Sequence, residues 1–107
     1  MDAIFTRTSV RAYADRPVDP EKLERLLRAG MAAPSARNQQ LGVLRDHRQG
    51  AASGPVRLQP LRRLRQKRGG RIVPCCRKEG LTAPDYALID LSAATENILL
   101  EAESLGL

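Results

Sequence analysis

The sequence predicts a single small domain that mixes α-helices with a short β-strand. Residues 20–32 and 82–107 repeat apolar side chains at helical spacing, and residues 71–76 form a short apolar run that predicts a strand. A chain of 107 residues is long enough for one modest core, yet it is shorter than a usual cofactor-enzyme subunit. We therefore expect one small domain over residues 1–107.

A short helix is expected at residues 2–6, where Ile4 and Phe5 offer apolar anchors. It is followed by Arg7-Thr8-Ser9-Val10-Arg11, in which two arginines flank two hydroxyl residues. Two guanidinium groups four residues apart can converge on one anion, because arginine binds phosphate oxygens in a bidentate way. A solvated basic turn is the alternative interpretation of this motif alone.

The helix over residues 20–32 has clear start and stop signals. Asp19 stands at the N-cap position, and Pro20 fits the first helical position because an N–H there has no helical partner. Pro34 ends the helix. One apolar face, at i, i+3, i+4, i+7 and i+8, comprises Leu23, Leu26, Leu27, Gly30 and Met31. This pattern indicates a core helix.

The turn after this helix is unusually rich in hydrogen-bonding groups. Residues 33–40 combine one proline, one hydroxyl, one guanidinium and three amides, carried by Pro34, Ser35, Arg37, Asn38, Gln39 and Gln40. A surface turn needs only one or two such groups to satisfy its own backbone. This density suits a polar, planar ligand held along its edge.

Basic residues are concentrated in the middle of the chain. Residues 1–40 have a net charge of +2, residues 41–71 of +8 and residues 72–107 of −4. The middle segment has no helical or strand periodicity, so we expect disorder or a weak helix, with a short basic helix at 60–67 as an option. It contains no aromatic residue that could stack on a base, which disfavours nucleic-acid binding.

The C-terminal part begins with the strand at 71–76 and continues with a helix that Thr82 or Ala83 would cap. Pro84 lies in its first turn, and Gly106 stands at the C-terminal capping position. Its expected apolar stripe comprises Leu88, Leu91, Ala94 or Thr95, Ile98, Ala102 and Leu105. Cys75 and Cys76 are adjacent, so they cannot pair without severe strain, and we expect reduced thiols in a buried strand rather than a disulfide or metal site.

Several of these motifs together resemble the FMN-dependent nitroreductase family. The matching segments are 7–13 (Arg-Thr-Ser-Val-Arg-Ala-Tyr), the helix start at 18–20 and 33–40 (Ala-Pro-Ser-Ala-Arg-Asn-Gln-Gln). The helix at 82–107 is similar to the long helix of that family's dimer core. Their order and spacing over 1–40, with this helix, make the resemblance fairly specific.

The resemblance implies an α+β, nitroreductase-like homodimer, here an incomplete helix-flanked sheet, with FMN at the subunit interface. It places Arg7, Thr8, Ser9 and Arg11 on the FMN phosphate and ribityl chain. It places a second group, from the partner subunit, beside the flavin: Pro34, Ser35, Asn38 and Gln40. Family members pass a hydride from NAD(P)H to the flavin and then to a nitroaromatic, quinone or similar acceptor. No side chain is nominated as a catalytic nucleophile or base.

The resemblance breaks off after Gln40. The family continues with Pro-Trp and an apolar strand, whereas this chain has Leu41-Gly42 and then the basic segment. The codons CCC TGG contain CTG G in a shifted frame, which would begin Leu-Gly. We therefore hypothesise that residues 41–71 are frameshifted, a hypothesis that the coding DNA tests directly. His47 lies in this segment and is expected to be uninvolved.

Three functions remain open from the sequence. The first is the FMN oxidoreductase, as a truncated member of the family. The second is a non-enzymatic basic module that binds nucleic acid or an anionic surface through residues 57–71, and the third is a non-functional remnant. No apolar run is long enough to span a bilayer and no signal-peptide pattern is present, so a cytoplasmic protein without a membrane partner is expected.

Overall fold

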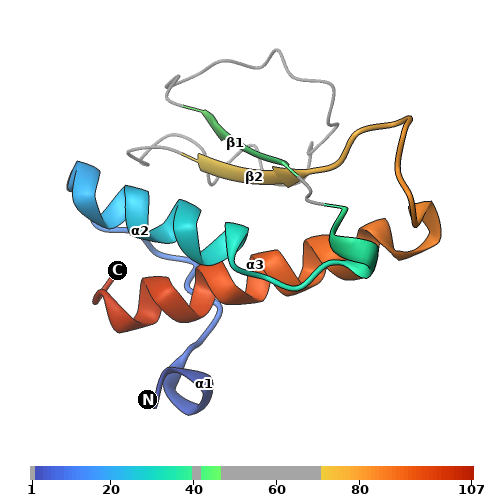
Figure 1. Cartoon of the computed structure of the whole chain (residues 1–107). Helices are drawn as coiled ribbons and strands as arrows, with labels where there is room; N and C mark the ends of the chain where they lie inside the picture. Colours follow the sequence, from blue (N-terminus) through green and yellow to red (C-terminus); the bar gives the residue numbers. More distant parts are fainter. Residues whose placement is uncertain (1, 40–41, 47–70) are drawn as a thin grey trace.

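The computed structural model describes residues 2–39, 42–46 and 71–107, with side chains for all of these except 42–46 and Arg71. The elements follow in the order α1 (Ala3–Thr6), α2 (Pro20–Met31), the 3-10 helix η1 (Ala36–Asn38), β1 (Gly42–Asp46), β2 (Arg71–Cys75), the 3-10 helix η3 (Pro84–Tyr86) and α3 (Ala87–Ser104). Figure 1 shows the two strands on one side of the paired helices α2 and α3, and α1 on the other side.

The helix expected over residues 20–32 is confirmed by α2. Asp19 precedes it as the N-cap residue and Pro20 takes its first position, although the Asp19 side chain makes no capping hydrogen bond. Leu26 and Gly30 are buried, whereas Met31 at the end of the predicted apolar face is 59% exposed. The face is therefore covered in its middle and open at its C-terminal end.

The helix expected at the C-terminus is confirmed by η3 and α3, and so is its glycine stop. Gly106 has a φ of +68°, its N–H donates to the carbonyl of Glu103 (3.1 Å), and the N–H of Leu107 donates to the carbonyl of Ala102 (3.0 Å). This pair of bonds is the Schellman arrangement, which satisfies carbonyls that have no helical partner.

The buried face of α3 differs from the expected stripe at its first turn. Leu88 is 76% exposed, while Ala87, Asp90 and Ala94 are buried. These three residues follow the helical spacing i, i+3, i+7. In the first turn of α3 the buried face therefore begins at Ala87, one residue before the Leu88 at which the expected stripe begins. The prediction is wrong at Leu88 because the face includes a carboxylate, which a search for apolar periodicity passes over.

The strand expected at 71–76 is confirmed by β2, which ends one residue earlier. It pairs antiparallel with β1, with Gly42 opposite Cys75 and Val43 opposite Pro74. The expectation of no regular structure after Gln40 is therefore wrong for residues 42–46. A five-residue segment is too short to show periodicity, and its pairing with β2 supplies the backbone hydrogen bonds that define it.

Other expectations for the middle segment fall on residues that the structure does not describe. These are the optional helix at 60–67, His47 and almost the whole basic module at 57–71. Cys75 is half-buried and Cys76 is exposed beyond the end of β2, and both are free thiols. The expectation of a buried pair of thiols is therefore wrong.

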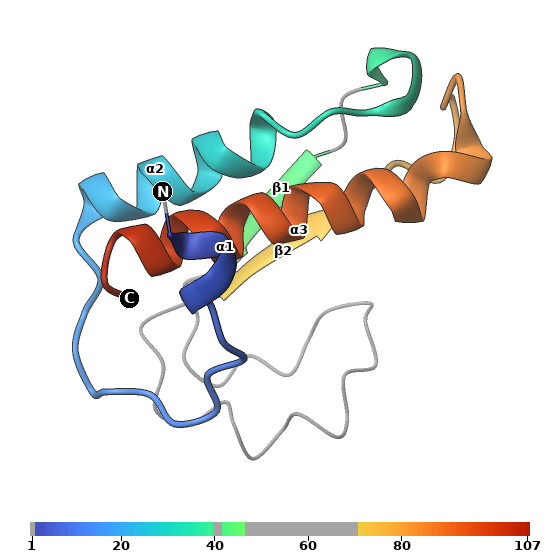
Figure 2. The same cartoon turned by 90° about the horizontal axis from the view of Figure 1, so that it is seen from below.

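Helices α2 and α3 run side by side in opposite directions, as Figure 2 shows from below. Arg25 and Glu101 form an ion pair of 2.6 Å between them, and Asn97 Nδ2 donates to the carbonyl of Ala29 at 3.2 Å. Ala29 lies in the last turn of α2, where carbonyls lack a helical partner. The two helices are thus fixed to each other by polar contacts as well as by packing.

Large apolar side chains remain exposed over the part of the chain that the structure describes. The buried apolar residues there are Ala3, Leu26, Ala87 and Ala94, mostly small, whereas Ile4 is 64% and Phe5 86% exposed. Helix α1 forms as expected, but Ile4 and Phe5 do not anchor it within this chain. No described helix is long and apolar enough to cross a bilayer.

Candidate functional site

The turn between α2 and β1 contains two consecutive residues in left-handed backbone conformations. Ser35 is extended, and Arg37 and Asn38 inside η1 each have a φ of +51°. Asparagine tolerates this region better than most residues, whereas arginine adopts it at a cost of about 1–2 kcal/mol. Such a conformation persists where surrounding contacts impose it.

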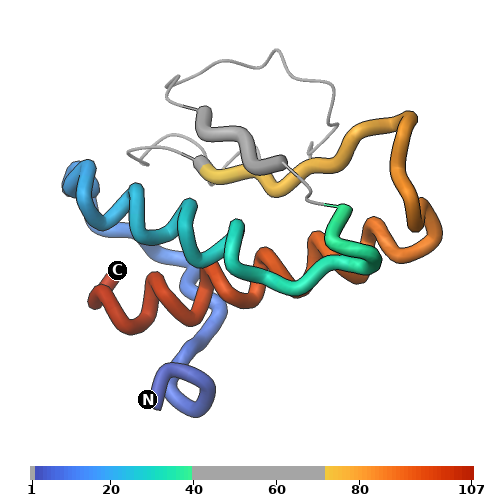
Figure 3. Tube along the Cα trace, viewed as in Figure 1, coloured from blue at the N-terminus to red at the C-terminus, as the bar shows by residue number. Residues whose placement is uncertain are grey.

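Those contacts come from Asp90 on the buried face of α3. Both of its carboxylate oxygens accept from the N–H of Ala36, at 3.0 and 3.1 Å, and Oδ2 also accepts from Nε2 of Gln39 at 2.6 Å. Gln39 Oε1 in turn accepts from the N–H of Ala83 at 3.2 Å. Figure 3 shows how the turn returns beside the start of α3, where these bonds form.

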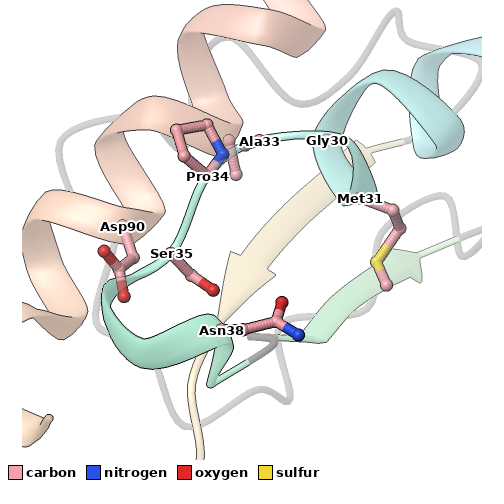
Figure 4. Close-up of a pocket in the computed structure, with 8 residues that line it drawn as sticks. Gly30, Met31, Ala33, Pro34, Ser35, Asn38 and Asp90 are labelled. Atoms are coloured by element: carbon pink, nitrogen blue, oxygen red, sulfur yellow. The ribbon is translucent and has the colours of Figure 1, made fainter.

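A small hollow of about 130 Å³ lies between this turn and the end of α2. It is lined by Gly30, Met31, Ala33, Pro34, Ser35, Asn38, Asp90 and Ala94. Figure 4 shows Asp90 directed at the turn from α3, with Asn38 extending from η1 on the side of Met31. Three of the predicted flavin-contacting residues, Pro34, Ser35 and Asn38, therefore line one hollow.

The other predicted group lines a separate and larger hollow of about 750 Å³. Arg7, Thr8, Ser9 and Arg11 all contribute to its wall, as do further cations at Arg16 and Lys22 and carboxylates at Asp19 and Glu103. Its volume falls within the range of ligand pockets, which is about 300–1,000 Å³. Guanidinium and hydroxyl groups on one wall suit an anionic, hydroxyl-bearing ligand.

Arg7 has a carboxylate partner in this structure. Its Nε lies 3.4 Å from Oε1 of Glu96 on α3, with the Arg7 side chain 27% and the Glu96 side chain 54% exposed. An ion pair so open to water contributes little to stability. The Arg7 guanidinium can therefore exchange Glu96 for another anion at low cost.

The structure brings each predicted group together but leaves the two groups apart within one chain. The Arg7–Arg11 group and the Pro34–Asn38 group line different hollows, while Gln40 lies outside the described residues. In the described part of the chain, no three His, Cys, Asp or Glu side chains gather as metal ligands. The described residues thus form two separate candidate half-sites, one lined by Arg7–Arg11 and the other by Pro34, Ser35 and Asn38.

Asp90 and Gln39 are the site residues that the sequence prediction missed. Both are only 6% exposed and both belong to the network behind the turn. The available signal was a carboxylate three residues after Ala87 and four before Ala94, on an otherwise apolar face. A buried carboxylate needs hydrogen-bond donors, and the amide-rich turn was the place to look for them.

This chain is similar to a known protein family and to curated proteins, and the family match includes both groups of candidate site residues. The model of the nitroreductase family matches residues 4–42. The chain is 37% identical over 108 residues to a protein of Archaeoglobus fulgidus named "Putative NADH dehydrogenase/NAD(P)H nitroreductase", covering 97% of this chain and 61% of that protein. A protein of Methanothermobacter thermautotrophicus with the same name is 33% identical, with 100% and 56% covered. The chain thus spans about three fifths of the length of these relatives.

Solved structures show the same relationship in three dimensions. A protein of the same name from Parabacteroides distasonis superposes with a TM-score of 0.83 at 37% identity, over 98% of this chain and 62% of that one. A protein from Desulfovibrio desulfuricans, described as "a putative nitroreductase in complex with fmn", superposes with a TM-score of 0.79 at 26% identity, over 97% and 62%. The similar proteins thus include one solved with FMN bound.

Proposed function

Since residues 4–42 of this chain belong to the nitroreductase family and its described residues have that family's fold, we propose that the protein acts as an FMN-dependent NAD(P)H oxidoreductase. The family resemblance and the nitroreductase-like α+β fold expected from the sequence are thereby confirmed. The observation that carries the proposal is that residues of the 7–13 segment line one hollow and residues of the 33–40 segment line another.

Arg7, Thr8, Ser9 and Arg11 would hold the FMN phosphate and ribityl chain. The fit is chemical, since two guanidiniums offer charge-assisted, bidentate bonds to phosphate and two hydroxyls suit a polyol. Thr8, Ser9 and Arg11 are exposed, so they can bind FMN without first breaking contacts in the protein interior. Arg7 would exchange its contact with Glu96 for the phosphate.

Pro34, Ser35, Asn38 and Gln40 would meet the flavin ring from the partner subunit of a homodimer. Two features support this arrangement: the two half-sites are separate in one chain, and large apolar side chains such as Phe5 and Leu88 lie exposed. An exposed apolar surface of this kind favours association with another chain. A second copy would complete each half-site with the other.

FMN, when bound, supplies the redox chemistry by accepting a hydride from NAD(P)H and passing it to a nitroaromatic, quinone or similar small acceptor. This chain's own residues bind and orient that group. Ser35 and Asn38 would offer hydrogen bonds along its edge, and Arg7 and Arg11 would fix its phosphate end. None of them needs to act as a nucleophile or a general base.

A flavin titration tests the proposal. The purified 107-residue protein is titrated into FMN, and quenching of flavin fluorescence gives the dissociation constant. Arg7→Ala and Arg11→Ala should each weaken binding about tenfold or more, since a hydrogen bond to a charged group contributes about 1.5–3 kcal/mol. Arg77→Ala, which removes an exposed cation after β2, is the matched control and should leave binding unchanged.

The second half of the test measures turnover. The flavin-loaded protein should oxidise NADH or NADPH in the presence of a quinone, at a rate that falls with flavin occupancy in the Arg7→Ala variant. Flavin binding with no oxidation of either nucleotide would overturn the assignment of the hydride donor. No flavin binding by the parent chain would overturn the proposed function for this chain.

A further inference from the structure

We propose that Asp90 is a positioning residue for the cofactor site: it holds the 35–39 turn in the conformation that presents Ser35 and Asn38 to the flavin. The identity of the ligand rests on the proposed function. The contacts between Asp90 and the turn are independent of it.

Asp90 is a buried carboxylate whose hydrogen-bond donors come from the turn. It is 6% exposed, and it accepts from the N–H of Ala36 and from Nε2 of Gln39. No ion pair joins it to any residue among 2–39 and 72–107. A buried charge without partners is strongly unfavourable, so the turn and the carboxylate stabilise each other.

Gln39 has a fixed amide orientation in this network. Its Nε2 donates to Asp90 and to the carbonyl of Ala83 at 3.1 Å, while its Oε1 accepts from the N–H of Ala83. Flipping the amide would place the Oε1 acceptor against a carboxylate and a carbonyl. The amide of Gln39 therefore joins three separate segments: the turn itself, Ala83 just before η3, and Asp90 on α3.

The strained residues lie between the two that Asp90 binds. Ala36 and Gln39 bracket Arg37 and Asn38, each with a φ of +51°. Left-handed residues other than glycine persist where neighbouring contacts over-determine them. Asp90 supplies those contacts from behind, with both oxygens directed at the turn, so its effect on a ligand passes through the turn.

The test replaces Asp90 with an uncharged residue of the same size. Asp90→Asn turns one of the two acceptor oxygens into an Nδ2 donor. With Oδ1 facing Nε2 of Gln39, Nδ2 faces the N–H of Ala36, so one of the two contacts to that N–H becomes a donor–donor contact and the remaining bonds lose their charge assistance. We expect an about tenfold higher dissociation constant for FMN and faster hydrogen exchange of the Ala36 amide. Asp85→Asn, the same change at an exposed position in η3, is the matched control and should show neither effect.

A rescue variant separates positioning from general stability. Glycine adopts a positive φ without steric cost, so Arg37→Gly lowers the strain that Asp90 must hold. The double variant Asp90→Asn/Arg37→Gly should recover part of the FMN affinity and slow the exchange of the Ala36 amide relative to Asp90→Asn. If Asp90→Asn alone does not fold, a folded double variant supports the proposal. A double variant that also fails to fold overturns it, because Asp90 would then serve the whole fold.

The outcomes distinguish the two proposals. Unchanged FMN affinity and unchanged Ala36 exchange in Asp90→Asn overturn the positioning role while leaving the flavin site intact. If the parent chain does not bind FMN, the proposed function fails. The Ala36 exchange rates of Asp90→Asn, Asp85→Asn and the double variant then decide by themselves whether Asp90 holds the turn.

Discussion

Gln39 Nε2 lies 2.6 Å from Oδ2 of Asp90, and each of the two residues is only 6% exposed, so one buried amide–carboxylate bond joins the turn after α2 to the second buried position of α3. This bond links residues 51 positions apart in the sequence. It connects the part of the chain that resembles a flavin site to the helix that supports it. The predictions below test this support and the half-sites around it.

Arg37→Gly should raise the free energy of unfolding by up to about 1 kcal/mol, because the arginine has a φ of +51° that glycine adopts without cost. Urea denaturation followed by circular dichroism measures the change. Arg28→Gly, in the last turn of α2, should lower stability by about 1 kcal/mol, because glycine is unfavourable in a helix and the contact with Glu24 is lost, and it is the contrasting control. A loss of stability in Arg37→Gly would show that the arginine side chain contributes more than its backbone strain costs.

Glu96→Gln should tighten FMN binding about two- to fivefold at low salt, because it frees Arg7 from its carboxylate partner at 3.4 Å. The gain should shrink as salt rises, since both side chains are partly exposed. Fluorescence titration at two ionic strengths measures this. Equal affinity at every salt concentration would mean that Arg7 does not bind the phosphate.

Leu88→Glu should weaken the proposed homodimer, because Leu88 is 76% exposed on the first turn of α3 and a charge there is unfavourable in an apolar interface. Sedimentation equilibrium gives the oligomeric state. Lys78→Glu introduces the same residue at an exposed turn position and should leave the dimer intact. Dimers of unchanged affinity in Leu88→Glu would exclude this surface of α3 from the interface.

Asn97→Ala should lower the free energy of unfolding by about 1 kcal/mol, because it leaves the carbonyl of Ala29 at the end of α2 without its 3.2 Å partner. Ser92→Ala, which removes an exposed hydroxyl bonded within α3, is the control and should have a smaller effect. Thermal unfolding measures both. Equal effects of the two substitutions would mean that the contact between the helices adds nothing beyond a local hydrogen bond.

Helices and their ends were predictable because their signals are local. Pro20 and Gly106 have backbone roles that the residue type itself dictates, and the structure places each where the sequence predicts. The strand β1 was missed because 24 residues separate it along the chain from β2, the strand with which it pairs. Such a pairing is non-local, so no sequence window of five residues contains it. The hypothesis of a shifted reading frame over 41–71 stays a prediction that the coding DNA tests.

The two groups of candidate site residues could be picked out from the sequence, but the hydrogen bonds that support the second group could not. Arg7 and Ser35 belong to motifs that stand out by the density of polar groups, whereas Asp90 appears in the sequence as one acidic residue among six in 72–107. Its burial depends on how α3 rotates against the turn. That rotation is set by tertiary contacts, which explains why Leu88 was expected to be buried and Asp90 was not.

The central claim is that this chain binds FMN through its two half-sites, and a visible spectrum of the purified protein tests it most directly. After incubation with FMN and removal of free ligand, the account predicts a yellow protein with flavin absorbance that is reduced by half or more in Arg7→Ala. A colourless parent protein, folded by circular dichroism and still without flavin, would contradict it.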